Sequence, residues 1–391
     1  MGGTLMTKTI SNSHIIFTLL ITLFGSACLS AQTAPQQQLE TTKDRMRANW
    51  RTNLEKRIVP LEEIIAGGPP KDGIPAINSP RFVAPLEAAE WLGGNEPVIS
   101  LTLKGESRAY PLQILMWHEI VNDQIQDQLV TVTFCPLCNT AIAFDRRLDG
   151  RALDFGVSGM LRHSDMVMYD RQTESWWQQI SGEALVGDLA GKILRQFPAQ
   201  IIGFDQFRRA FPKGKVLSRE TGFSRDYGRN PYTGYDSIDG KPFLFKGKTD
   251  TRLKPMERVV AIDLNGTAKA YPHSVTSRLR VIPDSIGETD LVVFHAEGAQ
   301  SALDRSRIAE SKDVGATGVF RPVHGGKRLT FSYKNGDFID KETGSQWNIL
   351  GQAVSGKLKG AQLERVVHSD IFAFAWLVFK PKTAIYRTEI K

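Results

Sequence analysis

A repeated segment constrains the fold of this chain more than any other sequence feature. Residues 98–111 contain a short apolar run, a Gly and the triplet Ala-Tyr-Pro, and residues 259–272 repeat this pattern. The offset is 161 residues, from Tyr110 to Tyr271. Later matches follow at offsets that drift, as loop insertions produce in a duplicated unit. The sequence therefore predicts two tandem related halves, an internal duplication packed as one unit.

The segments within each half are mainly typical of strands. They are short, rich in β-branched and aromatic residues, and bounded by Gly, Asp or Asn. Strands are expected at Val98–Leu103, Val130–Phe134, Ala141–Asp145 and Leu291–Phe294, and helices at Pro111–Asn122, Phe204–Ala210 and Ile371–Phe379. The predicted class is a β-rich α+β fold.

The domain organisation follows from the repeat and from changes in composition. The expected parts are a signal peptide (1–31), a polar tether with a short helix around 41–57 (32–57), the first half (58–215), a connecting loop rich in Tyr and Arg (216–257) and a second half (258–391). The second half is degenerate, because Phe294-His295-Ala296-Glu297 stands where the first half has Phe134-Cys135-Pro136-Leu137-Cys138.

The N-terminus predicts export. Lys8 precedes an apolar run at 15–24 and small residues up to Ala31, which is the pattern of a secretory signal. The run is too short to span a bilayer. Cleavage after Ala31 would give a periplasmic protein, whereas cleavage before Cys28 would give a lipid-anchored protein of the cell envelope. Membrane association is expected only through such an anchor at Cys28.

Composition excludes one class of partner. The net charge is +7, but Lys and Arg are scattered among acidic residues and form no basic cluster with interleaved aromatics. Nucleic acid is therefore not expected to bind, and the expected partner is a small molecule or a cell-envelope component. No nucleotide loop, HExxH helix or nucleophile elbow is found, so the common hydrolase and kinase activities have no support. Whether the protein is an enzyme is left open.

The cysteine pair is the motif most specific for chemistry. Of 3 cysteines, only Cys135 and Cys138 lie outside the signal, which excludes a disulfide framework. Cys-Pro-Leu-Cys between two predicted strands is typical of a metal knuckle, in which Pro136 tightens the turn and Asn139 tolerates a left-handed backbone. The pair therefore predicts a metal site with two thiolate ligands.

A closed metal site needs ligands beyond two thiolates. His118 is the first candidate, because it lies on a predicted helix just before the strand that leads to Cys135. His163 and Met168 follow in the next segment. Two thiolates with His suit zinc, and an added Met suits copper. The predicted cofactor is one copper or zinc ion, which would be catalytic if a coordination position stays open.

Other residues are candidates for orienting a ligand or contacting a substrate. They are charged or aromatic and lie near the candidate ligands or in the connecting loop: Glu119, Asp170, Arg171, Trp176 and Tyr232. Loops with several Tyr and Arg side chains often carry binding. The structural alternative is that Asp170 and Arg171 form ordinary packing and ion-pair contacts.

Two alternatives to a metal-binding protein stay open. A thiol–disulfide oxidoreductase would use Cys135 as its nucleophile, although the pair does not open a helix, which is the usual way to lower a thiol pKa. A non-catalytic glycan- or protein-binding module would instead use its Trp and Tyr side chains. In that case the Cys pair would be structural.

Several motifs taken together resemble a known family. They are Trp117–Asp123, Phe134–Asn139, Val167–Arg171, Asp226–Tyr232, Asp313–Phe320 and Thr343–Asn348. The pattern is similar to a family of exported prokaryotic proteins classed as a domain of unknown function, number 3179, over residues 58–390. The resemblance implies export and an intact two-half unit. It implies no activity, so the chemistry has to be argued from the residues.

Overall fold

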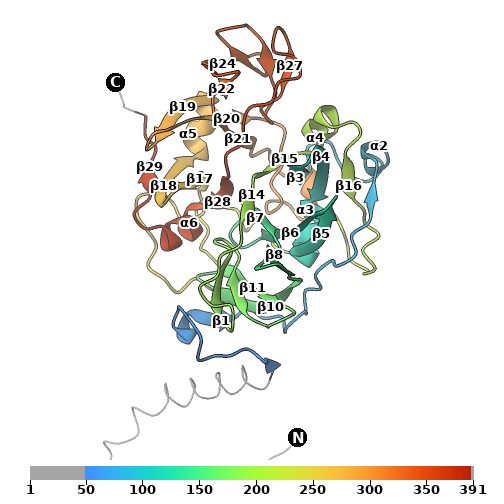
Figure 1. Ribbon diagram of the computed structural model, residues 1–391, viewed down its shortest axis with the longest axis vertical. Helices are drawn as coiled ribbons and strands as arrows, with labels where there is room; N and C mark the ends of the chain where they lie inside the picture. The colour runs from blue at the N-terminus through green and yellow to red at the C-terminus, as the bar shows by residue number, and fades with distance from the viewer. Residues whose placement is uncertain (1–48, 389–391) are drawn as a thin grey trace, which may run out of the picture. The chain divides into compact units, whose positions relative to one another are not determined.

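Short strands dominate the computed structural model, which describes residues 49–388, and its helices are few and short (Figure 1). The predicted β-rich α+β class is confirmed. None of the described helices is long and apolar enough to cross a membrane. The predicted signal peptide and most of the tether fall on residues 1–48, outside the described range. From Trp50 the chain forms one compact unit.

Three main sheets form in the first half of the sequence. The sheet β15-β3-β4-β16-β2 contains β2 (Phe82–Val83), β3 (Pro97–Leu103), β4 (Glu106–Pro111), β15 (Ala199–Gly203) and β16 (Lys215–Leu217). The sheet β14-β7-β6-β5 contains β5 (Ile120–Ile125), β6 (Gln128–Cys135), β7 (Thr140–Asp145) and β14 (Gln196–Phe197). The sheet β1-β10-β11-β12-β13 contains β1 (Ile64–Ala66), β10 (Phe155–Arg162), β11 (Asp165–Asp170), β12 (Trp176–Gln178) and β13 (Glu183–Val186).

The second half of the sequence also forms three main sheets. The sheet β28-β17-β18-β29 contains β17 (Arg258–Leu264), β18 (Thr267–Pro272), β28 (Ser369–Phe372) and β29 (Ala384–Ile385). The sheet β19-β20-β21 contains β19 (Val281–Ile286), β20 (Thr289–Ala296) and β21 (Ala316–Phe320). The sheet β24-β25-β26-β27 contains β24 (Phe331–Lys334), β25 (Asp337–Asp340), β26 (Gln346–Trp347) and β27 (Ala353–Ser355).

Short helices and hairpins connect these sheets. The helices are η1 (Leu61–Glu63), α2 (Pro85–Ala88), α3 (Leu112–His118), α4 (Phe204–Ala210), α5 (His273–Leu279), η2 (Ile308–Glu310) and α6 (Ala373–Phe379). The two-stranded pairs are β8 (Arg147–Leu148) with β9 (Arg151–Ala152), and β22 (Val323–His324) with β23 (Lys327–Arg328). Residues 218–257 form neither helix nor strand, whereas residues 216 and 217, the first two of the expected connecting loop, belong to β16.

The elements follow in the same order in the two stretches. A hairpin, a seven-residue helix and a second hairpin give β3-β4-α3-β5-β6 in one and β17-β18-α5-β19-β20 in the other. In each stretch a later short strand joins the first sheet in parallel, β16 beside β4 and β29 beside β18. That the two stretches arose by duplication stays a prediction.

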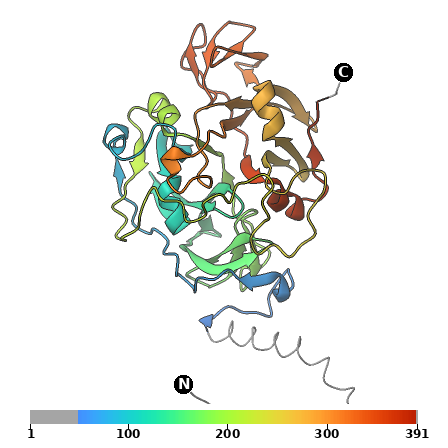
Figure 2. The same ribbon diagram turned by 180° about the vertical axis from the view of Figure 1, so that it is seen from behind.

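The two stretches share their hydrophobic core. Phe134 of β6 and Phe372 of β28 belong to one buried cluster, and Phe204 of α4 and Trp347 of β26 belong to another. Burying one such side chain contributes about 1.5–3 kcal/mol. Strand β28 packs beside β7, and β15 beside β21, so that the elements coloured cyan to green lie next to those in orange and red (Figures 1 and 2).

Two expected helices differ from the structure. The expected helix at 41–57 is not present over residues 50–57, because Trp50 packs edge-on against Tyr169 and Trp176 instead. The expected helix Pro111–Asn122 ends at His118, since Glu119 takes a φ of 57° and β5 begins at the next residue. This early end fixes the direction of the Glu119 side chain.

Candidate metal centre

The Cys pair forms the turn between two antiparallel strands. Cys135 ends β6, and β7 begins at Thr140. The Cys138 amide donates to the Cys135 carbonyl at 3.3 Å and the Asn139 amide donates to the Pro136 carbonyl at 3.2 Å. Asn139 has a φ of 55°, the left-handed conformation expected at this position. Both cysteines are free, with 1% and 0% of their surface exposed.

A second hairpin brings a carboxylate to this turn. Strands β10 and β11 are joined by His163 and Ser164, which both have positive φ, as a tight type I′ turn requires. Asp165, the first residue of β11, follows directly. The sulfur atoms of Cys135 and Cys138 and a carboxylate oxygen of Asp165 lie within 4.8 Å of one another. The Cys138 thiol also donates to the Ser164 carbonyl at 3.5 Å.

The partners of Asp165 leave one of its oxygens free. Oδ2 accepts hydrogen bonds from Gln178 Nε2 at 2.6 Å and from the Ile180 amide at 3.0 Å. Oδ1 is buried and has no hydrogen-bond partner among residues 49–388. Burial raises the pKa of Asp165 to about 6, although these two hydrogen bonds and the neighbouring Cys138 and Cys135 thiols act in the opposite direction. A buried oxygen with a free lone pair is suited to coordinate a metal ion.

Glu119 adds a second buried carboxyl group beside the cluster. It follows α3 and is 8% exposed. Burial, and then the charge of Asp165, raise the pKa of Glu119 to about 8. Burial also raises the pKa of the Cys135 and Cys138 thiols. Four acidic groups are therefore buried together, and the pKa of each lies above its ordinary value in the metal-free chain.

The comparisons with known proteins identify the family of the chain. The family described as "Protein of unknown function (DUF3179)" matches residues 71–383. The chain belongs to this family. No curated protein and no solved structure matches it. For this DUF3179 protein the resemblance expected from the sequence is thus confirmed, and no activity comes with it.

His118 of the DUF3179 protein lies in a different contact network. Its Nδ1 is 2.7 Å from the Pro75 carbonyl oxygen, and its Nε2 is 2.6 Å from the Tyr227 hydroxyl. Both ring nitrogens are thus engaged by residues outside the cluster. Among the described residues, the group with metal-ligand spacing contains Cys135, Cys138 and Asp165, and His118 is not part of it.

The other two ligand candidates also lie apart from this group. His163 occupies the β10–β11 turn, and its Nε2 is 3.4 Å from a Glu63 carboxylate oxygen, while its ring contacts Phe379. Met168 is fully buried in β11 and belongs to the hydrophobic core. The segment that contains His163 does reach the Cys turn, but the side chain that it brings to the two sulfur atoms is the carboxylate of Asp165.

Tyr232 lies close to the cluster. Burial, followed by the charges of Glu119 and Cys135, raises the pKa of its hydroxyl. Tyr235 stands 6.5 Å away, ring centre to ring centre, and its hydroxyl donates to the Leu137 carbonyl at 3.1 Å. The connecting loop therefore covers the Cys turn with two tyrosines.

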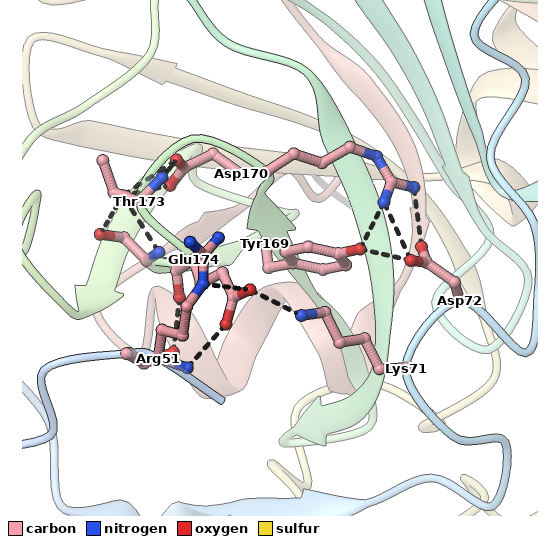
Figure 3. A network of polar contacts seen from close by, with 10 residues as sticks. Arg51, Lys71, Asp72, Tyr169, Asp170, Thr173 and Glu174 are labelled. Atoms are coloured by element: carbon pink, nitrogen blue, oxygen red, sulfur yellow. Dashed lines mark hydrogen bonds and ion pairs between the residues drawn. The ribbon is translucent and has the colours of Figure 1, made fainter. Parts of the chain in front are cut away.

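Asp170 closes a turn. It accepts hydrogen bonds from the Thr173 amide at 2.6 Å and from Trp177 Nε1 at 2.9 Å (Figure 3 shows Asp170 and Thr173). Asp340 makes the equivalent bond with Trp347 Nε1, at 2.9 Å, in the second stretch. These contacts match the structural alternative for Asp170.

Arg171 and its neighbours attach the N-terminal segment to the β10–β11 sheet. The Arg171 guanidinium binds both Asp72 oxygens, at 2.8 and 2.9 Å. Glu174 accepts from Arg51 Nε at 3.1 Å and from Lys71 Nζ at 2.9 Å (Figure 3). Trp176 is 0% exposed, so its indole is not available to a partner in this conformation.

Proposed function

We propose that this protein is an exported metal-binding protein in which Cys135, Cys138 and Asp165 hold one zinc ion. Glu119 is the candidate for a fourth ligand. The observation that carries the proposal is the burial of four acidic groups side by side without a cation. Within residues 49–388, no basic side chain forms an ion pair with Glu119 or Asp165.

A divalent cation would remove the penalty that this burial imposes. Ionised carboxylates and thiolates in an apolar interior are strongly disfavoured unless a positive charge compensates them. The raised pKa values of the four groups express this penalty. A bound metal inverts the effect, because coordinating thiols lose their protons outright. Metal binding is therefore expected to release protons and to stabilise the fold.

The donor set favours zinc over copper. Thiolate sulfur together with carboxylate oxygen is a common zinc set, whereas copper(I) is selected by soft sulfur ligands. With His118 and Met168 engaged elsewhere, a copper site built from two thiolates, an imidazole and a thioether has no support from the residues that gather at the turn. The proposed set is two thiolates with one or two carboxylates.

The proposed role of the metal is structural. Both thiols are almost completely buried, which suits a closed site rather than one with an open position for a substrate. The same turn contacts the second half of the chain. The Phe372 amide donates to the Cys138 carbonyl at 3.0 Å, and Asn139 Nδ2 donates to the Asp370 carbonyl at 3.2 Å. A metal in the turn would hold this junction in place.

Elemental analysis tests the proposal directly. The mature chain, purified without chelator, is expected to contain about one zinc per molecule. The Cys135→Ser/Cys138→Ser variant is expected to contain none. In Asp165→Asn, which keeps the side-chain shape, zinc should be retained less tightly. Asp188→Asn is the matched control, because Asp188 lies on the surface and pairs with Lys56.

Cobalt substitution gives a second, independent measurement. A cobalt(II) ion bound by the two thiolates would produce sulfur-to-metal charge-transfer absorption, which the double Cys variant would lack. If wild type and the double variant carry the same negligible metal after purification and after reconstitution, the proposal is wrong.

The oxidoreductase alternative has less support. A catalytic thiol needs access to its substrate and a lowered pKa. Here burial raises the pKa of both thiols, and the pair lies in a β-hairpin turn rather than at the start of a helix. A reversible disulfide with a measurable reduction potential in the folded chain would nevertheless support the oxidoreductase over the metal-binding protein.

We also propose export to the periplasm or cell envelope and an origin of the two stretches by duplication. Export rests on the signal-like residues 8–31, with cleavage after Ala31 or lipidation at Cys28 as the two routes. Duplication is supported by the repeat at residues 98–111 and 259–272 and by the common order of elements. N-terminal sequencing and mass analysis of the exported chain would distinguish the two routes.

A further inference from the structure

An open cleft lies in the second stretch, on the side of the chain that has no cysteine. Its volume is 810 Å³, which is in the range of small-molecule sites. Helix α5 lines it with His273 and Ser277 and strand β20 with His295, and Gly315, the residue that precedes β21, lines it too. The proposed metal site uses none of these residues.

Two imidazoles in the cleft are each oriented through one nitrogen. His273 Nε2 is 3.0 Å from Asp370 Oδ1, which also accepts from Thr317 Oγ1 at 2.7 Å. His295 Nδ1 is 2.9 Å from the Thr276 hydroxyl. The ring centres are 5.3 Å apart and the rings are nearly perpendicular. In both residues the second nitrogen has no hydrogen bond within the described chain.

Two of the polar atoms around the cleft are buried and unsatisfied. They are His273 Nδ1 and Arg280 Nη1, neither of which has a partner among residues 49–388. Arg280 Nη2 donates to Glu297 at 2.5 Å, so the guanidinium is held in place while its Nη1 has no partner among the described residues. A buried polar atom without a partner costs about 1–3 kcal/mol. A ligand that supplies acceptor oxygens would remove this cost for Arg280 Nη1, whereas His273, whose Nε2 faces Asp370, could donate through Nδ1 only with a proton on both nitrogens.

Backbone geometry keeps the space beside these atoms open. Arg280 has a φ of 64°, which is unusual for a residue with a side chain and is found preferentially at functional sites. Gly315 has a φ of 78°, and a Cβ built on it would come within 2.2 Å of His295 Nε2. Only glycine therefore fits beside that nitrogen without displacing the His295 ring.

The same lining contains five carboxylates, and each of them has a partner: Asp236, Glu257, Glu297, Asp304 and Asp313. Asp236 is paired with Arg258 at 2.9 Å and with Lys312 at 3.0 Å. Asp313 accepts the amides of Gly298 and Gly315, each at 2.7 Å. The groups that remain unsatisfied are thus nitrogen atoms of Arg and His rather than acceptor oxygens.

We propose that this cleft binds a small oxyanion, a carboxylate or phosphate group, through Arg280, His273 and His295. Arginine suits such groups because its planar guanidinium matches their oxygens. Burial lowers the pKa of His295 to about 3, so this ring is neutral. In the tautomer that carries its proton on Nε2, Nδ1 accepts from the Thr276 hydroxyl and Nε2 can donate to the ligand without adding charge.

The two stretches then use equivalent positions for opposite charges. Glu119 follows α3 as Arg280 follows α5, and both have positive φ. Cys135 ends β6, and His295 lies at the end of β20. Two carboxyl groups and two thiols lie together at the first site, whereas the second combines carboxylates that already have partners with the nitrogen atoms of Arg280, His273 and His295. The second site would bind an anion where the first would bind a cation.

Binding is tested on the full mature chain by calorimetric titration with inorganic phosphate and with acetate at constant ionic strength. We expect saturable binding of at least one of them. Which anion binds tells whether the ligand carries a phosphate or a carboxylate group. Arg280→Gln should weaken it tenfold or more, whereas Arg328→Gln should leave it unchanged. Arg328 is the matched control, because it pairs with Asp290 on the surface.

Histidine NMR of the wild-type chain keeps the test valid if Arg280→Gln does not fold. Phosphate or acetate should shift the ring signals of His273 and His295 and leave those of His324, on β22, in place. The absence of saturable binding to both anions, or equal binding by both Arg variants, would overturn the proposal. Zinc content is measured separately, so failure of the anion site does not affect the metal site.

Discussion

Replacing Glu119 with Gln should change how the stability of the metal-free protein depends on pH. Glu119 has a pKa of about 8 in the folded chain, against a usual value of 4.5. The folded protein therefore holds this proton more tightly than the unfolded chain does. The resulting stabilisation is fully present below pH 4.5 and is lost as the pH rises through about 8. Glutamine cannot ionise, so the variant lacks this loss.

The size of the effect follows from the two pKa values. A pKa difference of one corresponds to about 1.4 kcal/mol, so the free energy of unfolding of the wild type should fall by up to roughly 5 kcal/mol over this window. This is a large part of the stability of a typical domain, which is about 5–15 kcal/mol. Asp165 should add a smaller decline between pH 3.8 and about 6, which the Glu119→Gln variant retains.

Urea unfolding followed by Trp fluorescence, in the presence of a chelator at a series of pH values, measures this directly. Glu310→Gln is the matched control, because Glu310 is an exposed residue of η2. The control should follow the wild-type curve. If Glu119→Gln and wild type lose the same free energy between pH 5 and pH 9, Glu119 is not the buried acid inferred here. With zinc bound the order of stability should reverse. The variant should then be less stable than the wild type, because it lacks a candidate ligand.

Three further predictions concern the turns of the fold. Asn139→Gly keeps the left-handed backbone but loses the hydrogen bond to β28, and urea unfolding should show a loss of about 1 kcal/mol. Trp177→Phe and Trp347→Phe each remove an indole bond to a buried carboxylate, so calorimetry should show similar losses of about 1–3 kcal/mol, and very different losses would argue against equivalent turns. In the chelated, folded chain a thiol reagent should modify Cys135 and Cys138 only as fast as the protein opens, whereas reaction at the rate of a free thiol would contradict their burial.

Much of the fold was predictable because its signals are local. Alternating apolar residues bounded by turn residues predicted the strands at Val98–Leu103 and Val130–Phe134, and β3 and β6 confirm them. Where the helix after Pro111 ends was not predictable, because the positive φ of Glu119 is imposed by the strand that follows. No sequence rule requires a Glu to adopt it.

The candidate metal site was predictable only in part. The Cys-Pro-Leu-Cys turn is a local motif, so two of its residues could be named from the sequence. Asp165 depends on the β10–β11 hairpin folding back onto the turn, and a single Asp at the start of a strand carries no signal of that contact. His118 is favoured as a ligand by its closeness in sequence and its typical ligand type. Neither reason determines where the ring nitrogens point.

The hydrogen bond between Asn139 and Asp370 joins residues 231 positions apart. In contrast, Cys135, Cys138 and Asp165 lie within one short stretch of the chain. Local contacts form faster than distant ones. In an exported, metal-binding form such as we propose, the cluster would therefore be able to capture its metal while the C-terminal part is still emerging. The rigid turn would then be the surface on which β28 docks, so that metal supply would control how fast the chain completes its folding.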